Sequence, residues 1–118
     1  MELKTTQPYK RITEFKINED IKVNGLEEAL KILNELEPGA VFVLKTNDYK
    51  HIPMLKIRDE QIGNYRIVYF GKGFDIIKLG VLELHLKKAV AIQIRQDIVG
   101  VMNSYANCVF YQSPKIQN

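Results

Sequence analysis

The residues best suited to binding chemistry form an aromatic and basic cluster that begins at Tyr65. In the run from Tyr65 to Phe70, Tyr65 and Tyr69 fall at positions of the same parity, and Arg66 lies between them. In a β-strand this spacing puts both tyrosine rings on one face. Tyrosine rings can stack on nucleobases and arginine can contact phosphate, so the pattern suggests a nucleic-acid or nucleotide binder. The alternative is structural, with both rings packed on the helix predicted over 26–36 and their hydroxyls at its rim.

A second group of candidate binding residues lies in the run from Val81 to Arg95. Its alternation predicts one long, bent strand, or two strands that share a face through a bend at Lys87–Lys88. The polar side chains His85, Lys87 and Arg95 would then form a basic outer face, and we expect a partner there or along the strand edge. The apolar residues that carry this pattern all occupy even positions: Leu82, Leu84, Leu86, Val90, Ile92 and Ile94.

Side chains that could support catalysis or bind a metal are few. The chain has two histidines, His51 and His85, and one cysteine, Cys108, and no pair of them has ligand spacing. We therefore expect no metal site and no cofactor. A small hydrolase or nuclease stays as a second alternative, with His85, Cys108 or Asp59 as its candidate residues. The absence of a catalytic constellation favours a protein that is not an enzyme.

Composition limits the class of protein. A chain of 118 residues has the length of one domain, and a single cysteine allows no internal disulfide, which fits a reducing, cytoplasmic compartment. No apolar run reaches the length of a membrane span, so no membrane partner is expected. Residues 1–37 have a net charge of −2 and residues 38–118 of +5. An acidic start and a basic body are compatible with an anionic partner, although solvation alone also explains them.

The apolar spacing predicts an α+β fold with a single antiparallel or mixed sheet of about six strands. One clear helix is expected over 26–36, capped at Asn24 and packed on a face of the sheet, and a second short helix over 97–106. The expected strands include a buried central strand over 40–45, a hairpin of 54–58 with 65–70, and strands over 74–79 and 108–111. The domain would span 9–112, with flexible tails at 1–8 and 113–118.

These observations predict a small non-enzymatic binding or regulatory protein that acts through a protein partner or through self-assembly. A strand longer than the domain needs favours a homo-oligomer, most simply a dimer. The small size and the Lys-, Ile- and Asn-rich composition are typical of bacterial or phage accessory proteins. Nucleic-acid or nucleotide binding on the basic and aromatic sheet face is the first alternative.

Overall fold

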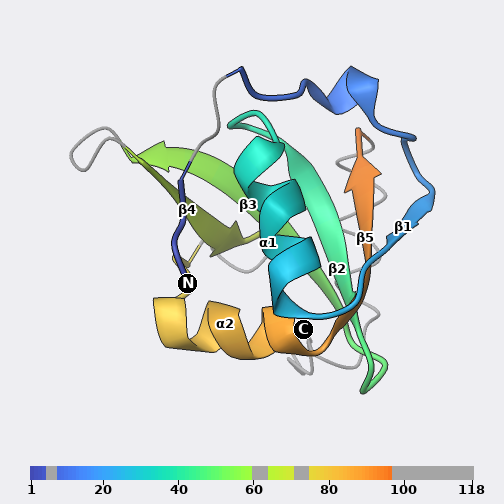
Figure 1. The fold of residues 1–118 in the computed structure, drawn as a ribbon. Coiled ribbons are helices and arrows are strands. Elements are labelled where there is room, and N and C mark those ends of the chain that lie inside the picture. The colour runs from blue at the N-terminus through green and yellow to red at the C-terminus, as the bar shows by residue number, and fades with distance from the viewer. Residues whose placement is uncertain (5–7, 60–63, 71–74, 97–118) are drawn as a thin grey trace, which may run out of the picture.

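The computed structural model describes residues 1–4, 8–59, 64–70 and 75–96, which form an antiparallel five-stranded sheet with two α-helices on one face (Figure 1). The strand order is β1-β5-β2-β3-β4. The single-sheet α+β prediction is confirmed, with five strands in the described residues instead of about six. The elements in chain order are a short 3-10 helix η1 (Ile12–Glu14), β1 (Asp20–Lys22), α1 (Leu26–Glu35), β2 (Val41–Thr46), β3 (His51–Asp59), β4 (Asn64–Tyr69), α2 (Leu79–Lys87) and β5 (Ala89–Arg95).

Helix α1 confirms the helix predicted over 26–36. Its buried side is formed by Ala29 and Leu33, at the i, i+4 spacing that places both side chains on one face. The expected N-cap at Asn24 is wrong by one residue, because Gly25 is the N-cap and has a φ of 86°. Glycine adopts this backbone conformation without a steric penalty. The backbone N–H of Asn24 instead donates to the side chain of Glu28 at 2.9 Å.

The predictions for the middle of the sheet are also confirmed. β2 is the central strand and is buried on both faces over Val41–Leu44, as its unbroken apolar run predicts. The hairpin of β3 and β4 is confirmed, with Lys56 opposite Ile67. The face that carries the main core lies under both helices; its buried apolar strand residues are Phe42, Leu44, Ile52, Met54, Tyr65, Ile67, Ala89, Ile92 and Ile94.

The long strand predicted from Val81 to Arg95 is wrong in its first half. Residues 79–87 form α2, and only Ala89–Arg95 forms a strand. Leu82 and Leu86 lie one helical turn apart and are fully buried, whereas Leu84 between them is 59% exposed. The alternating leucines therefore belong to a helix that buries Leu82 and Leu86 and leaves Leu84 exposed.

The strand predicted over 74–79 is also wrong for its described residues. Ile76 makes a single isolated antiparallel bridge with Val68, and Leu79 already belongs to α2. The predicted helix over 97–106, the last strand over 108–111 and the tail at 113–118 lie outside the described residues. Leu3, in the stretch expected to be a tail, is 8% exposed and belongs to the core.

A lysine closes the C-terminal end of α1. Lys56 has a core position on β3, and its side chain is fully buried. Its Nζ donates to the carbonyl oxygens of Leu33 at 2.7 Å and Asn34 at 3.4 Å, and also to that of Leu36. The last carbonyls of a helix lack partners within the helix. Lys56 therefore supplies hydrogen bonds that α1 could not make alone, and its positive charge faces the negative end of the helix dipole.

Candidate functional site

Two of the residues singled out from the sequence meet in the structure. The hydroxyl of Tyr69, on β4, lies 3.2 Å from Nε2 of His85, on α2. The two rings are nearly perpendicular, with an interplanar angle of 79° and centroids 6.3 Å apart. Both side chains are half-buried. The contact exists because His85 is on a helix that packs against the sheet; on the outer face of a strand it would have pointed to solvent.

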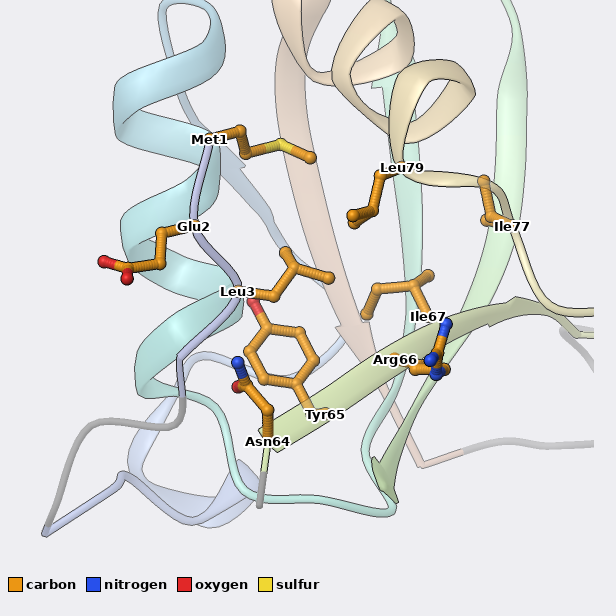
Figure 2. A pocket seen from close by; sticks show the side chains of 9 residues that line it. All are labelled: Met1, Glu2, Leu3, Asn64, Tyr65, Arg66, Ile67, Ile77 and Leu79. Carbon is orange, nitrogen blue, oxygen red and sulfur yellow. The ribbon is translucent and has the colours of Figure 1, made fainter. Parts of the chain in front are cut away.

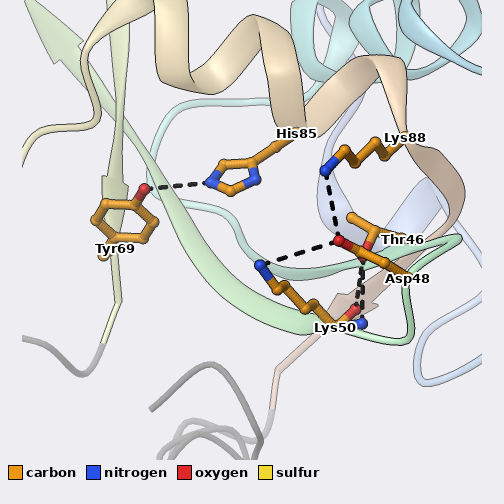
Figure 3. A network of polar contacts seen from close by, with 6 residues as sticks. All are labelled: Thr46, Asp48, Lys50, Tyr69, His85 and Lys88. Atoms are coloured by element: carbon orange, nitrogen blue, oxygen red, sulfur yellow. Dashed lines mark hydrogen bonds and ion pairs between the residues drawn. The ribbon is translucent and has the colours of Figure 1, made fainter. Parts of the chain in front are cut away.

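Two lysines and one carboxylate lie beside this pair (Figure 3). Asp48, in the turn between β2 and β3, accepts a hydrogen bond from the hydroxyl of Thr46. Its Oδ2 lies 3.9 Å from Nζ of Lys50 and 3.4 Å from Nζ of Lys88, the C-cap residue of α2. The Thr46 hydrogen bond holds the pKa of the Asp48 carboxyl below its usual range, with the two lysines acting in the same direction. The carboxylate is thus ionised at neutral pH.

The electrostatic environment of His85 is positive. Burial lowers the pKa of His85, and the charges of Lys50 and Lys88 lower it further, whereas Asp48 opposes them. The imidazole is therefore neutral at pH 7, with one ring nitrogen protonated. Burial raises the pKa of Tyr69, so that its hydroxyl keeps its proton. The site thus combines a neutral donor–acceptor pair with two ammonium groups.

The other tyrosine of the predicted binding face lies inside the molecule. Tyr65 is 1% exposed, and its hydroxyl donates to Oδ1 of Asn34 on α1. Nζ of Lys56 lies 4.1 Å from the centre of its ring. Tyr65 thus contacts α1 through its hydroxyl group, as the structural alternative predicts, whereas Tyr69 contacts α2 instead. A ring enclosed in this way has no open face on which a base could stack.

The remaining candidate residues are distributed over separate parts of the fold. Nε of Arg66 is paired with Asp59 at 2.5 Å. Lys87 lies on α2, 3.5 Å from Glu83. Arg95 is at the far end of β5, opposite Val41, and its Nη1 donates to Gln93 at 3.0 Å. The structure therefore brings Tyr69 and His85 together but gives Arg66, Lys87 and Arg95 no shared site with them; their role in binding stays a prediction.

A cavity of about 200 Å³ lies between the N-terminal segment, β4 and the start of α2 (Figure 2). Its walls are mainly apolar, and Asn64, Arg66 and Glu2 add polar groups. The apolar lining residues are Met1, Leu3, Tyr65, Ile67, Ile77 and Leu79. Two of them, Met1 and Leu79, are 42% and 55% exposed, so the cavity adjoins apolar surface.

Helix α2 also carries exposed apolar side chains. Leu79, Val81 and Leu84 are 55%, 38% and 59% exposed, although Leu82 and Leu86 of the same helix are fully buried. A Cβ placed on Gly80 would meet no atom of the described residues within 4 Å. We call these four residues, Leu79, Gly80, Val81 and Leu84, the α2 surface. A surface helix normally presents polar residues on the side away from the core.

Sequence reasoning missed the charged half of the Tyr69–His85 site. Nothing in the sequence singled out Asp48 or Lys50, and Lys88 entered only as part of the bend predicted at Lys87–Lys88. The one local signal is the Thr46-Asn47-Asp48 order after an apolar strand, which is typical of a turn with side-chain hydrogen bonds. Among the described residues, no group of three His, Cys, Asp or Glu side chains could hold a metal ion.

Neither helix in the described part of the chain is long and apolar enough to cross a membrane. Comparison of the chain with protein-family models gives no match, and comparisons with curated proteins and with solved structures give none either. The function is therefore argued from the residues of this chain alone.

Proposed function

We propose that the chain is a small non-enzymatic binding or regulatory protein, of the bacterial or phage accessory kind, that acts through a protein partner or through self-assembly. The observation that carries this proposal is the α2 surface. Three large apolar side chains stand exposed on a helix of nine residues. Clusters of exposed apolar side chains on a small protein commonly mark a protein–protein interface.

Gly80 supports the same function. Glycine weakens a helix relative to alanine, by up to about 1 kcal/mol in a helix interior. The described part of the fold gives no reason for this cost, since Gly80 has no left-handed φ and no described neighbour near the position of a Cβ. A partner that packs closely against α2 would use the space that the missing side chain leaves. Leu84 is one turn away and would lie in the same contact.

Self-association is tested by the mass of the protein in solution. We expect wild-type protein to exceed the monomer mass of 13.7 kDa at high concentration in multi-angle light scattering. The double variant Val81→Lys/Leu84→Lys should return the mass to the monomer. Val90→Lys is the matched control, because Val90 is 43% exposed on β5, outside the α2 surface. It should leave the mass unchanged.

A separate protein partner is tested by a photo-cross-linking amino acid placed at position 84 in the native cell, with position 90 as the control site. We expect one protein cross-linked from position 84 and not from 90. After identification and purification, that protein should bind wild-type chain and lose binding to the double variant. A chain that stays monomeric at all concentrations and yields no such cross-link contradicts the proposal.

A further inference from the structure

The cavity between the N-terminal segment, β4 and the start of α2 reaches into the core of the protein. Four of its lining side chains are buried: Leu3, Tyr65, Ile67 and Ile77 are 8%, 1%, 1% and 4% exposed. Protein cores contain few voids larger than a water molecule, because a void removes packing contacts from the side chains around it. A cavity of about 200 Å³ at this place therefore lowers stability unless another group fills it.

Two walls of the cavity are held by one residue of α1, Asn34. Its Oδ1 accepts a hydrogen bond from the backbone N–H of Lys4 at 3.2 Å, and its Nδ2 donates to the carbonyl oxygen of Glu2 at 3.4 Å. The hydroxyl of Tyr65 donates to the same Oδ1. The N-terminal segment and β4 are thus fixed to a single side chain, which sets the spacing between these two walls.

The size and the polarity of the cavity limit what it can hold. A cavity of about 150 Å³ lined by Leu, Ile and Phe side chains is large enough for benzene. The volume of about 200 Å³ therefore suits a somewhat larger ring system, such as indole. Figure 2 shows the carboxylate of Glu2 pointing away from the other lining side chains, and Nε of Arg66 is paired with Asp59. Because a charge buried between apolar walls is unfavourable, a ligand of this cavity is neutral.

One polar atom of the lining lacks a hydrogen bond. Oδ1 of Asn64 is buried and has no hydrogen-bond partner within the described part of the chain. An unpaired buried oxygen is uncommon in folded proteins, because it has lost its water without gaining a donor. The terminal torsion of an asparagine side chain is soft, so the carboxamide can turn its oxygen toward a donor inside the cavity.

We propose that this cavity binds a small, neutral, ring-sized molecule through one N–H or O–H group that donates to Asn64. The apolar body of the ligand fills the void, and its donor pairs the carboxamide oxygen. The proposal does not rest on the function proposed above. Leu79 belongs to both the cavity and the α2 surface, but the experiments on the two sites change different residues, so failure of one leaves the other in place.

The test compares indole with benzofuran, which has the same bicyclic shape but carries a ring oxygen in place of the N–H. Methyl signals of the full chain are followed by NMR during each titration. We expect saturable shifts for Ile67 and Ile77, which line the cavity, and much smaller ones for Ile52, a core residue outside it. Indole should bind at least about fivefold more tightly, because benzofuran leaves the oxygen of Asn64 unpaired.

Asn64→Leu removes the acceptor and keeps a side chain of similar size. It should abolish the preference for indole and leave benzofuran affinity within about twofold of wild type, because the apolar contacts remain. Asn47→Leu is the matched control, since it removes an exposed carboxamide in the turn between β2 and β3 and should keep the preference. The proposal is overturned by equal affinities in wild type, by a preference that survives Asn64→Leu, or by the absence of saturable shifts with both compounds.

Two further variants test whether the compounds occupy the cavity itself. Leu3→Phe and Ile77→Phe enlarge a side chain on two different walls, and each should weaken both compounds about tenfold or more by taking up the space. Circular dichroism identifies the variants that keep the fold, and two walls are used so that one folded variant is sufficient. Undiminished binding by a folded variant would place the compounds elsewhere and contradict the proposal.

Discussion

Replacement of Lys56 by methionine should destabilise the protein by an amount that grows with pH. The substitution keeps an unbranched side chain of similar length but removes the only donor group of Lys56 from the end of α1. The carbonyl oxygens of Leu33 and Leu36 would be left buried without that hydrogen bond. A buried acceptor left without a partner costs about 1–3 kcal/mol, so two such acceptors cost together about 4 kcal/mol.

At neutral pH much of this loss is offset, because the variant no longer buries a charge. Burial lowers the pKa of Lys56 from 10.5 to about 8 in the folded protein. This difference means that charged Lys56 lowers the free energy of unfolding by about 3 kcal/mol at pH 7. Between pH 8 and 10.5 the unfolded chain binds more protons at this residue than the folded chain does. Wild-type stability therefore gains from this residue as the pH rises through that window.

The difference between wild type and Lys56→Met should accordingly grow from about 1 kcal/mol at pH 7 to about 3 kcal/mol or more at pH 10. Urea unfolding followed by circular dichroism at pH 7, 8, 9 and 10 measures it. Taking the difference between the two proteins removes the contribution of the other titrating groups. The exposed Lys31 on α1 gives the control Lys31→Met, which should differ from wild type by less than about 0.5 kcal/mol at every pH. A difference for Lys56→Met that stays constant or shrinks with pH would refute the reasoning.

Two pairs of variants and one single variant test the fold further by urea unfolding. Leu82→Ala should lower the free energy of unfolding by about 2–5 kcal/mol and Leu84→Ala by less than about 1 kcal/mol, because only Leu82 is in the core. Equal losses would instead support a strand, in which both leucines lie on one face. Gly80→Ala should stabilise by up to about 1 kcal/mol, whereas Gly39→Ala should destabilise by a similar amount, since Gly39 has a φ of 95°; equal signs would contradict this. Tyr65→Phe should cost about 1 kcal/mol through its lost hydrogen bond to α1, and no change would show that bond to be dispensable.

The parts of the fold that could be predicted are those in which one local pattern dominates. In α1, leucines at helical spacing are followed by Pro38-Gly39, and the helix ends before them. In β2, four consecutive apolar residues have no helical period, and the strand is buried on both faces. In both segments the local preference and the tertiary burial agree, so the sequence alone was sufficient.

In α2 the pattern itself was ambiguous. Leu82, Leu84 and Leu86 alternate as a strand would, but Leu82 and Leu86 are also one helical turn apart. The residue types distinguished the two readings better than the spacing did. Leucine favours helices, whereas the β-branched residues that favour strands dominate only after Lys88, as Val90, Ile92 and Ile94. The change in composition at Lys88 marks the end of the helix.

The Tyr69–His85 site could not be predicted because it depends on contacts between distant segments. Asp48 and Lys88 are forty positions apart, and they meet because α2 ends where β5 begins beside β2. If residues 79–87 are predicted as a strand, His85 is assigned to the wrong element, and its contact with Tyr69 cannot be predicted either. A single error in secondary structure therefore concealed the whole site.

Among the described residues, Lys56 is the one fully buried charged side chain and Leu84 is the most exposed large aliphatic one. Lys56 is polar and fully buried, and the carbonyl oxygens at the end of α1 account for it. Leu84 is apolar and 59% exposed, and it lies one helical turn from Gly80, a glycine that nothing in the described part of the fold requires. A polar group in a core needs a partner inside the protein, whereas an apolar group on the surface gains stability only from a partner outside it. The first exception is thus explained by the fold, and the second is the reason to look for function at α2.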